Sequence, residues 1–513
     1  NILKTVRKGV GSTDPCSIEA NDIVIENAYD FLGRLDWSKD GEGNLTSYDY
    51  TQSGKPEKTI YADNSQEVYG YDDAGRLSVT VDQENNYTII EHDSLGNTLK
   101  QTVYDCNDTA AVLTDDFEVR QVRFVYDNLG NLIRKTAMKE PASTSPVNLN
   151  TDMVTDYYFD YTTGLLDYKV NYFDGSSANQ AQTDYYYDEI GRVWKTVDPM
   201  ANETRVYYDP VNNAQVDTIE YVETDLNDAS NSYIVTQKFS YDDYGRKYTS
   251  TLDRAVENDL ITTFQYDGLG RLDSQTAPDN IVTRYFYDGF GNVSYKIEDY
   301  DPNTSSPAEN RITDYKHNRL GQQVRVTGFD DPNTQSTIYT YDDNDSVLSI
   351  TYPDNKSVSY IYDNRGNLEQ ETQRNGQIVY YGYDYTGNLL WESEDSLGNP
   401  LNADFHSELT YDAAGQVLNS NKYAYGLITS ESDFVYNGFG LADSETTALY
   451  SLDPVTTSYT YDQSGSILSR THGSETINYL HDALGRIASI DRGTVDIVEY
   501  TYVGRNKKSI EYP

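Results

Sequence analysis

The sequence contains little cysteine, methionine, histidine or proline, and it has no long apolar run. Its 513 residues include 2 cysteines, 3 methionines, 5 histidines and 14 prolines. Two cysteines are too few for a disulfide framework, although Cys16 and Cys106 can pair with each other. No run of about 18 apolar residues occurs, so we expect no membrane insertion. No stretch sustains the helical period either, which favours an all-β chain.

Basic residues are also scarce, since 39 lysines and arginines face 83 acidic residues for a net charge of −44. A nucleic-acid partner requires basic patches, so this class is excluded, and anionic membrane surfaces are disfavoured. The acidity can bind Ca²⁺ loosely. A specific calcium loop is not expected, because Asp342-Asp343-Asn344-Asp345 lacks the later glycine and glutamate of an EF-hand. We therefore expect no cofactor.

The residue patterns of common active sites are missing. The histidines and cysteines form no His-x-x-x-His or Cys-x-x-Cys pair, so no zinc site is expected. Neither a Gly-x-Ser-x-Gly nucleophile motif nor a phosphate-binding Gly-x-x-x-x-Gly-Lys loop occurs. Carboxylates are abundant, but turns account for most aspartates. We expect no catalytic residues, no metal ligands and no enzymatic activity.

Tyrosine is abundant, with 50 copies, and much of it belongs to one repeated pattern, Tyr-Asp-x-x-Gly. The pattern occurs eleven times. Its tyrosine, aspartate and glycine are Tyr29, Asp30 and Gly33; Tyr71, Asp72 and Gly75; Tyr126, Asp127 and Gly130; Tyr187, Asp188 and Gly191; Tyr241, Asp242 and Gly245; Tyr266, Asp267 and Gly270; Tyr287, Asp288 and Gly291; Tyr362, Asp363 and Gly366; Tyr383, Asp384 and Gly387; Tyr411, Asp412 and Gly415; Tyr461, Asp462 and Gly465. We interpret these residues as structural turns.

One copy, residues 71–91, predicts a hairpin. Asp72 can accept backbone N–H groups at the start of a type I turn, and Gly75 can take the left-handed conformation that closes it. Residues 76–81 then alternate, which predicts a strand with one buried face. We expect each tyrosine to bury its ring and direct its hydroxyl to solvent. The second turn of a repeat is also explicit, since Asn375-Gly376 predicts a two-residue hairpin.

The copies recur about every 21 residues, for example at Tyr29, Tyr50, Tyr71 and His92. A fixed period of about 20 to 50 residues indicates a repeat architecture. We expect residues 1–28 to join a continuous hairpin array over residues 29–513, itself a piece of a longer array. His92, His317 and His481 occupy the tyrosine position and are interpreted as structural substitutes.

Polar insertions interrupt the period at residues 139–150, 174–182, 225–232 and 299–310. Insertions on one side of a repeat array often decorate a binding face. Tolerated variation of surface loops is the favoured explanation, and the sequence leaves both alternatives open.

The iterated Tyr-Asp-x-x-Gly-Arg/Asn pattern resembles the YD-repeat, or Rhs-repeat, family. The resemblance is clearest in Tyr71-Asp72-Asp73-Ala74-Gly75-Arg76-Leu77 and in Tyr266-Asp267-Gly268-Leu269-Gly270-Arg271-Leu272. It implies an all-β array of antiparallel hairpins wound into a spiral β-sheet shell or tube with a hollow interior. Family settings are Tc toxin and Rhs toxin shells, wall-associated proteins and teneurins. In the toxins the shell encloses a C-terminal effector.

The chain departs from the toxin pattern in one respect. Toxin shells typically end in an Asp-Pro-x-Gly autoprotease motif, and no Asp-Pro of this chain has glycine three residues after the aspartate. We therefore favour a non-enzymatic, extracellular structural or adhesive scaffold that is secreted or on a cell surface. One alternative is the shell segment of a secreted toxin with an enclosed effector. Another is a surface that binds glycans through rows of exposed tyrosines. In each case the expected partners include further repeats of the same or neighbouring chains.

Overall fold

A computed structural model describes most of the chain. The described residues are 2–7, 23–105, 117–141, 147–148, 151–172, 180–210, 212, 214–223, 233–253, 258–301, 310–328, 336–450, 452–493, 495–503 and 506–512. Cys16 and Cys106 lie outside them, so their pairing stays a prediction.

Strands are the only regular elements among the described residues. The first twenty-five are β1 (Ile2–Arg7), β2 (Ile23–Tyr29), β3 (Leu35–Lys39), β4 (Leu45–Tyr50), β5 (Pro56–Ile60), β6 (Gln66–Tyr71), β7 (Leu77–Val81), β8 (Tyr87–His92), β9 (Thr98–Asp105), β10 (Phe117–Tyr126), β11 (Leu132–Ala137), β12 (Met153–Phe159), β13 (Leu166–Tyr172), β14 (Gln180–Tyr187), β15 (Val193–Val197), β16 (Glu203–Tyr208), β17 (Val216–Glu223), β18 (Tyr233–Tyr241), β19 (Lys247–Asp253), β20 (Leu260–Tyr266), β21 (Leu272–Thr276), β22 (Val282–Tyr287), β23 (Val293–Glu298), β24 (Arg311–His317) and β25 (Gln323–Thr327). The others are β26 (Ser336–Tyr341), β27 (Val347–Thr351), β28 (Ser357–Tyr362), β29 (Leu368–Thr372), β30 (Ile378–Tyr383), β31 (Leu389–Ser393), β32 (Phe405–Tyr411), β33 (Val417–Ala424), β34 (Leu427–Tyr436), β35 (Ala442–Leu449), β36 (Val455–Tyr461), β37 (Ile467–His472), β38 (Glu475–His481), β39 (Ile487–Arg492), β40 (Val495–Val503) and β41 (Asn506–Glu511).

All 41 strands form a single antiparallel sheet in which each strand pairs with the next one along the chain. The sheet is therefore a continuous series of hairpins, as the repeat predicts. The register shifts by one residue where Tyr71 pairs with Leu77, which is a β-bulge beside the Tyr-Asp turn. Bulges increase local twist and bend the strand that contains them.

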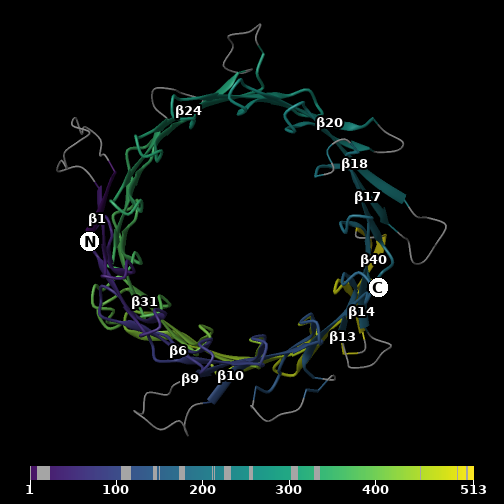
Figure 1. The fold of residues 1–513 in the computed structure, drawn as a ribbon. Helices are drawn as coiled ribbons and strands as arrows, with labels where there is room; N and C mark the ends of the chain where they lie inside the picture. The colour runs from purple at the N-terminus through teal and green to yellow at the C-terminus, as the bar shows by residue number, and fades with distance from the viewer. Residues whose placement is uncertain are drawn as a thin grey trace.

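The sheet winds into a spiral of more than one turn (Figure 1). From β1 it passes β6 and β10, rises past β14 and β20, returns over β24 to β31, and then follows its own first turn to β40 (Figure 1). We call β1 to β25 the first coil and β26 to β41 the second coil. The described residues form an open spiral and do not close into a shell; that part of the expected fold is not shown.

The spiral has two kinds of edge. We name the row of turns that follow the even-numbered strands the Tyr-Asp rim, and the connections that follow the odd-numbered strands the return rim. The predicted insertions fall in the connections between β11 and β12, β13 and β14, β17 and β18, and β23 and β24, and most of their residues (142–146, 149–150, 174–179, 225–232 and 302–309) lie outside the described residues. One boundary was wrong, because residues 180–182 belong to β14.

The sheet is a single layer with a thin core. Its accessible surface is 29640 Å², whereas a globular monomer of the same mass exposes about 19,000 Å². The prediction of one buried and one open face fails at β7, where all five residues are half-buried. Both faces of the strands share the burial, because cross-strand neighbours cover each side chain only partly.

Candidate functional site

The Tyr-Asp turns share one hydrogen-bond pattern. In the turn after β6, the Gly75 N–H donates to the Asp72 carbonyl at 2.7 Å, and the Asp72 N–H donates to the Arg76 carbonyl at 2.9 Å. One carboxylate oxygen of Asp72 accepts the Arg76 backbone N–H at 2.8 Å, and the other accepts Arg76 Nε at 2.7 Å. Gly75 has φ of 78°, a left-handed conformation that suits glycine. These contacts explain why the pattern requires aspartate and glycine at a fixed spacing.

The Tyr-Asp-x-x-Gly turns of the first coil contain aspartates with a lowered pKa: Asp30, Asp72, Asp127, Asp188, Asp242, Asp267 and Asp288. The pKa of Asp72 is lowered chiefly because its carboxylate accepts the Arg76 backbone N–H. The pKa of Asp242 is lowered chiefly by the Arg246 side chain, and that of Asp127 by the amide of Asn131. Arginine and asparagine after the glycine are thus interchangeable, because both donate to the second carboxylate oxygen.

A ladder of tyrosines connects successive hairpins. Arg271, which pairs with Asp267 at 2.7 Å, also places its guanidinium carbon 4.3 Å from the centre of the Tyr287 ring. The Tyr287 hydroxyl donates to the Leu272 carbonyl at 2.8 Å. The same hydroxyl-to-carbonyl bond joins Tyr50 to Leu35, Tyr71 to Pro56, Tyr187 to Leu166, Tyr208 to Val193, Tyr241 to Val216, Tyr266 to Lys247, Tyr341 to Gln323, Tyr362 to Val347, Tyr411 to Leu389, Tyr461 to Ala442 and Tyr502 to Ile487.

The ladder corrects the expectation that the tyrosine hydroxyls face solvent. Each of these hydroxyls satisfies the first carbonyl of the strand behind it, and burial raises the pKa of Tyr362 and Tyr461. A glycan-binding surface needs open aromatic faces, whereas the rings of Tyr50, Tyr208 and Tyr287 lie under arginines. These ladder tyrosines therefore do not present the open ring faces on which the glycan hypothesis depends.

Histidine replaces tyrosine in the ladder without changing its geometry. His92 Nε2 lies 2.8 Å from the Leu77 carbonyl, the position that a tyrosine hydroxyl takes elsewhere. His317 and His481 stand at the same bulge, opposite Gln323 and Ile487. The interpretation of these histidines as structural substitutes is confirmed for His92 by this contact.

The return turns copy the Tyr-Asp turn, which corrects the two-residue hairpin expected at Asn375-Gly376. Gly376 is left-handed with φ of 87°, but Asn375 has no positive φ, and the Gln373 N–H donates to the Gln377 carbonyl at 2.8 Å. A two-residue type I′ turn needs positive φ at both positions. Asn280 and Asn355, with φ of 69° and 60°, take the same place as Gly376 in their turns.

The two coils meet along a seam that joins residues about 300 positions apart. The Tyr-Asp rim of the second coil contacts the return rim of the first. The Gly41 N–H donates to Asn344 Oδ1 at 3.1 Å, and Asn344 Nδ2 donates to Asp40 at 2.9 Å. The same second-coil turn also binds the end of β1, where Arg7 donates to the Asp345 carboxylate through two nitrogens at 2.9 and 3.2 Å.

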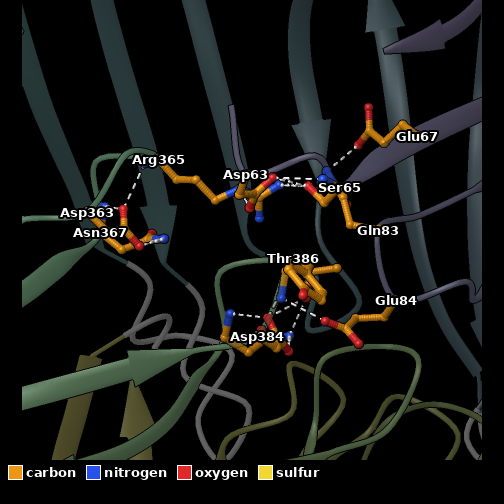
Figure 2. Close-up of polar contacts among 12 residues, drawn as sticks. Asp63, Ser65, Glu67, Gln83, Glu84, Asp363, Arg365, Asn367, Asp384 and Thr386 are labelled. Carbon is orange, nitrogen blue, oxygen red and sulfur yellow. Dashed lines mark hydrogen bonds and ion pairs between the residues drawn. The ribbon is translucent and has the colours of Figure 1, made fainter. Parts of the chain in front are cut away.

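Arg365 makes several contacts across the seam (Figure 2). Its guanidinium binds Asp63 at 2.7 Å and Ser65 at 2.6 Å, and its carbon lies 5.0 Å from the centre of the Tyr61 ring. Its side chain is only 16% exposed. One turn further on, the Tyr385 N–H donates to Glu84 at 2.7 Å.

Close backbone approach completes the seam. The Gly438 N–H donates to the Lys139 carbonyl at 2.8 Å, and a Cβ at Gly438 would meet the Met138 carbonyl oxygen at 2.3 Å. A Cβ at Gly41 would meet the Asp343 carbonyl oxygen at 2.4 Å. Sequence reasoning missed the seam, because its residues lie in turns of different coils and share no local pattern.

Acidic groups also approach one another across the seam. Burial and the nearby Asp384 raise the pKa of Asp82, and burial and Glu42 raise the pKa of Asp343. The seam therefore contains two carboxylates whose charged form is disfavoured, in contrast to Asp72, Asp127 and Asp242. No group of three or more metal-ligating side chains occurs among the described residues. The described part of the chain also has no helix long and apolar enough to cross a membrane.

Comparison with known proteins identifies the repeat. Residues 341–378 match the RHS Repeat family. No curated protein sequence matches the chain. Among solved structures, the chain is similar to one in the crystal structure of TcdB2-TccC3 (TM-score 0.53, 15% identity, 99% of this chain and 28% of that chain). It is also similar to chains in the TcdB2-TccC3-Cdc42 crystal structure (TM-score 0.52, 16% identity, 96% and 27%) and in the Photorhabdus luminescens Tc holotoxin pore (TM-score 0.52, 16% identity, 94% and 26%).

These similarities concern the fold, since the identities are 15% to 16%. The chain spans about a quarter of the length of the structures that it matches. The matches cover 94% to 99% of this chain and therefore include both coils.

Proposed function

We propose that this RHS-repeat chain is a segment of the encapsulating shell of a secreted toxin, whose wall encloses an effector. The chain carries RHS repeats, and its β-sheet scaffold resembles that of Tc toxin structures. The observation that carries the proposal is the seam, in which the Tyr-Asp rim of one coil is bonded to the return rim of the other. A wall built of stacked coils can become taller while it stays one β-sheet thick.

The wall suits a container because one set of contacts stabilises it around the spiral and another set stabilises it along the spiral axis. Around the spiral, strand pairing and the tyrosine ladder join each hairpin to the next. Along the spiral axis, turn-to-turn contacts such as Arg365 with Asp63 join coil to coil. The wall itself has no role in chemistry under this proposal, and any catalytic activity belongs to the enclosed polypeptide.

A structural or adhesive scaffold, expected above from the sequence, is the second candidate. It needs only the stable repeat array and a charged surface, and the net charge of −44 fits a soluble surface module. The comparisons support the shell hypothesis better, because the similar structures are Tc toxin assemblies. Secretion is part of both hypotheses.

Electron microscopy of the natively purified particle tests the proposal. A discrete hollow particle with internal density supports it, and regular filaments with no enclosed density contradict it. Protease treatment of the same particles gives a second readout. The enclosed polypeptide should resist digestion in the native particle and be digested faster in the Arg365→Ala variant, which weakens the seam. The Arg374→Ala variant is the control, because Arg374 pairs with Asp354 inside one coil.

A further inference from the structure

One pair of tyrosines projects from the sheet face that lies opposite the tyrosine ladder. Tyr158 immediately precedes Phe159, which takes the ladder position in β12, so its side chain points to the other face of the sheet. Tyr158 lies directly opposite Tyr168 of β13, and the two rings stack with their centres 4.3 Å apart. Tyr158 is 40% exposed, so its ring is accessible from this face.

This tyrosine pair lines a pocket of about 700 Å³ on the face of the sheet, together with the aliphatic side chains of Val125 and Ile133. These apolar residues belong to strands, so they do not depend on what lies against the rim. Asp156, only 5% exposed, accepts Nε and Nη2 of Arg134 at 2.5 and 2.6 Å. The pocket carries a net negative charge, because four aspartates and one arginine line it: Asp127, Asp156, Asp160, Asp167 and Arg134.

A second aromatic pair at the same register position has a cation of its own. Phe286 stacks on Tyr295 with ring centres 4.2 Å apart, and the guanidinium carbon of Arg284 lies 5.2 Å from the centre of the Phe286 ring. Arg284 precedes Phe286 by two residues in β22, whereas the residue two positions before Tyr158 is Asp156. Among the described residues, no arginine or lysine lies over the Tyr158 ring. The pair at Tyr158 thus has a carboxylate where the pair at Phe286 has its guanidinium.

The next hairpin shows that a tyrosine at this position binds an ammonium group. Tyr186 takes the register position of Tyr158, and Lys195 lies opposite it as Tyr168 lies opposite Tyr158. The Nζ atom of Lys195 is 3.9 Å from the centre of the Tyr186 ring. A cation over an aromatic face is attracted by the quadrupole of the ring. Two aromatic sites on this face therefore hold internal cations, and the site at Tyr158 does not.

We propose that the pocket at Tyr158 and Tyr168 binds an organic cation of the alkylammonium class. The exposed tyrosine ring attracts the ammonium group, the aspartates complement its charge, and Val125 and Ile133 accept its alkyl substituents. The same aspartates disfavour anionic ligands. The proposal concerns the face of the first coil and does not depend on an enclosed effector.

Isothermal titration calorimetry of the whole purified chain with choline chloride tests the site. Choline should bind, whereas its uncharged isostere 3,3-dimethylbutan-1-ol should bind at least about tenfold more weakly. Phosphocholine, whose phosphate meets the aspartates, should also bind more weakly than choline. Equal affinities for choline and the isostere would show an apolar pocket without cation recognition and overturn the proposal. Tighter binding of phosphocholine, or no binding of choline at millimolar concentrations, overturns it as well.

Substitutions of Tyr158 separate the aromatic face from simple apolar contact. Tyr158→Leu keeps an apolar side chain without the ring and should weaken choline binding at least about fivefold. Tyr158→Phe keeps the ring and should retain the affinity. Phe286→Leu is the matched control, because Phe286 holds the same register position and already lies beside Arg284. An equal loss of choline affinity in Phe286→Leu, or none in Tyr158→Leu, contradicts the assignment of the site.

Tyr168→Lys is a second test, since it copies the arrangement of Lys195 opposite Tyr186. The new ammonium group should occupy the pocket and lower the affinity for choline at least about tenfold. Unchanged affinity in this variant overturns the proposal. Thermal unfolding of each variant shows whether lost binding is lost folding. If Tyr168→Lys does not fold, the comparison of Tyr158→Leu with Tyr158→Phe decides.

Discussion

Two Tyr-Asp turns have the same backbone and different surroundings: residues 267–271 on the Tyr-Asp rim of the first coil, here called the free rim, and residues 363–367 on the seam. Asp267 and Asp363 make equivalent bonds to the backbone N–H of Arg271 and Asn367, both at 2.9 Å. Gly270 and Gly366 have φ of 83° and 85°. The tip residues differ, since Leu269 lies open and Arg365 binds Asp63 across the seam. The fixed positions thus form the turn, and the variable positions decide which coil it contacts.

The largest effect should come from the position that both turns share. Gly270→Val places a β-branched residue in a left-handed conformation and should cost about 2 to 3 kcal/mol of unfolding free energy in its hairpin. Gly268→Val, in the same turn, should cost well under about 1 kcal/mol, since a Cβ there meets nothing within 4 Å. Hydrogen exchange of β20 and β21 measures both. Equal losses would refute the turn assignment.

Substitution of the first glycine in a turn should lower stability on the seam and leave it almost unchanged on the free rim. Gly438→Ala puts a methyl group against the Met138 carbonyl oxygen and should destabilise the seam by about 1 to 2 kcal/mol. Gly268→Ala, the same turn position on the free rim, should be close to neutral. The exchange protection of the Gly438 N–H, compared with that of the β20 amides, reports the difference. Similar behaviour of the two variants would mean that the coils are not in contact at this point.

Removing the Arg365 side chain should have a smaller effect on the same seam. Arg365→Ala leaves Asp63 without its ion pair and should cost about 1 kcal/mol, because the pair is partly shielded from solvent. Arg374→Ala should cost less than about 0.5 kcal/mol, since the Arg374 side chain is 48% exposed and binds within its own coil. Thermal melting of the two variants makes the comparison, and a larger loss for Arg374→Ala would contradict it.

The smallest effect should come from a change of pH. Asp72 and Asp267 have lowered pKa values, so their stabilising contribution is present above about pH 4 and is lost as the pH falls through the folded-state pKa. Asp82 and Asp343 have raised pKa values, so their contribution is present below about pH 4 and is lost as the pH rises through the folded-state pKa. Protection factors should therefore shift in opposite directions for turns and seam between about pH 3 and pH 6. Parallel shifts in both regions would show that the seam carboxylates are not coupled.

The residue patterns were sufficient for the hairpin, and the resemblance to the YD-repeat family supplied the spiral; neither gave the contacts between the coils. Asp72 and Gly75 predict their turn because the contacts are local, and the succession of copies predicts a meander of neighbouring strands. The hydroxyl bond of Tyr287 was missed because a tyrosine pattern does not show where its hydroxyl points. The pairing of Arg365 with Asp63 could not be inferred, because it depends on the curvature of the whole sheet and on the number of strands in one coil.

The separation of about 300 residues across the seam has a consequence for how the chain is made. Hairpins need only neighbouring residues, so each can form soon after it leaves the ribosome. Asp63 must wait for Arg365, which at about 5 to 20 residues per second is a delay of roughly 15 to 60 seconds. During that time the return rim of the first coil is uncovered. Asp40, Asp63 and Glu84 of this rim have no seam partner until then, and their like charge disfavours association with other nascent chains on the same messenger RNA.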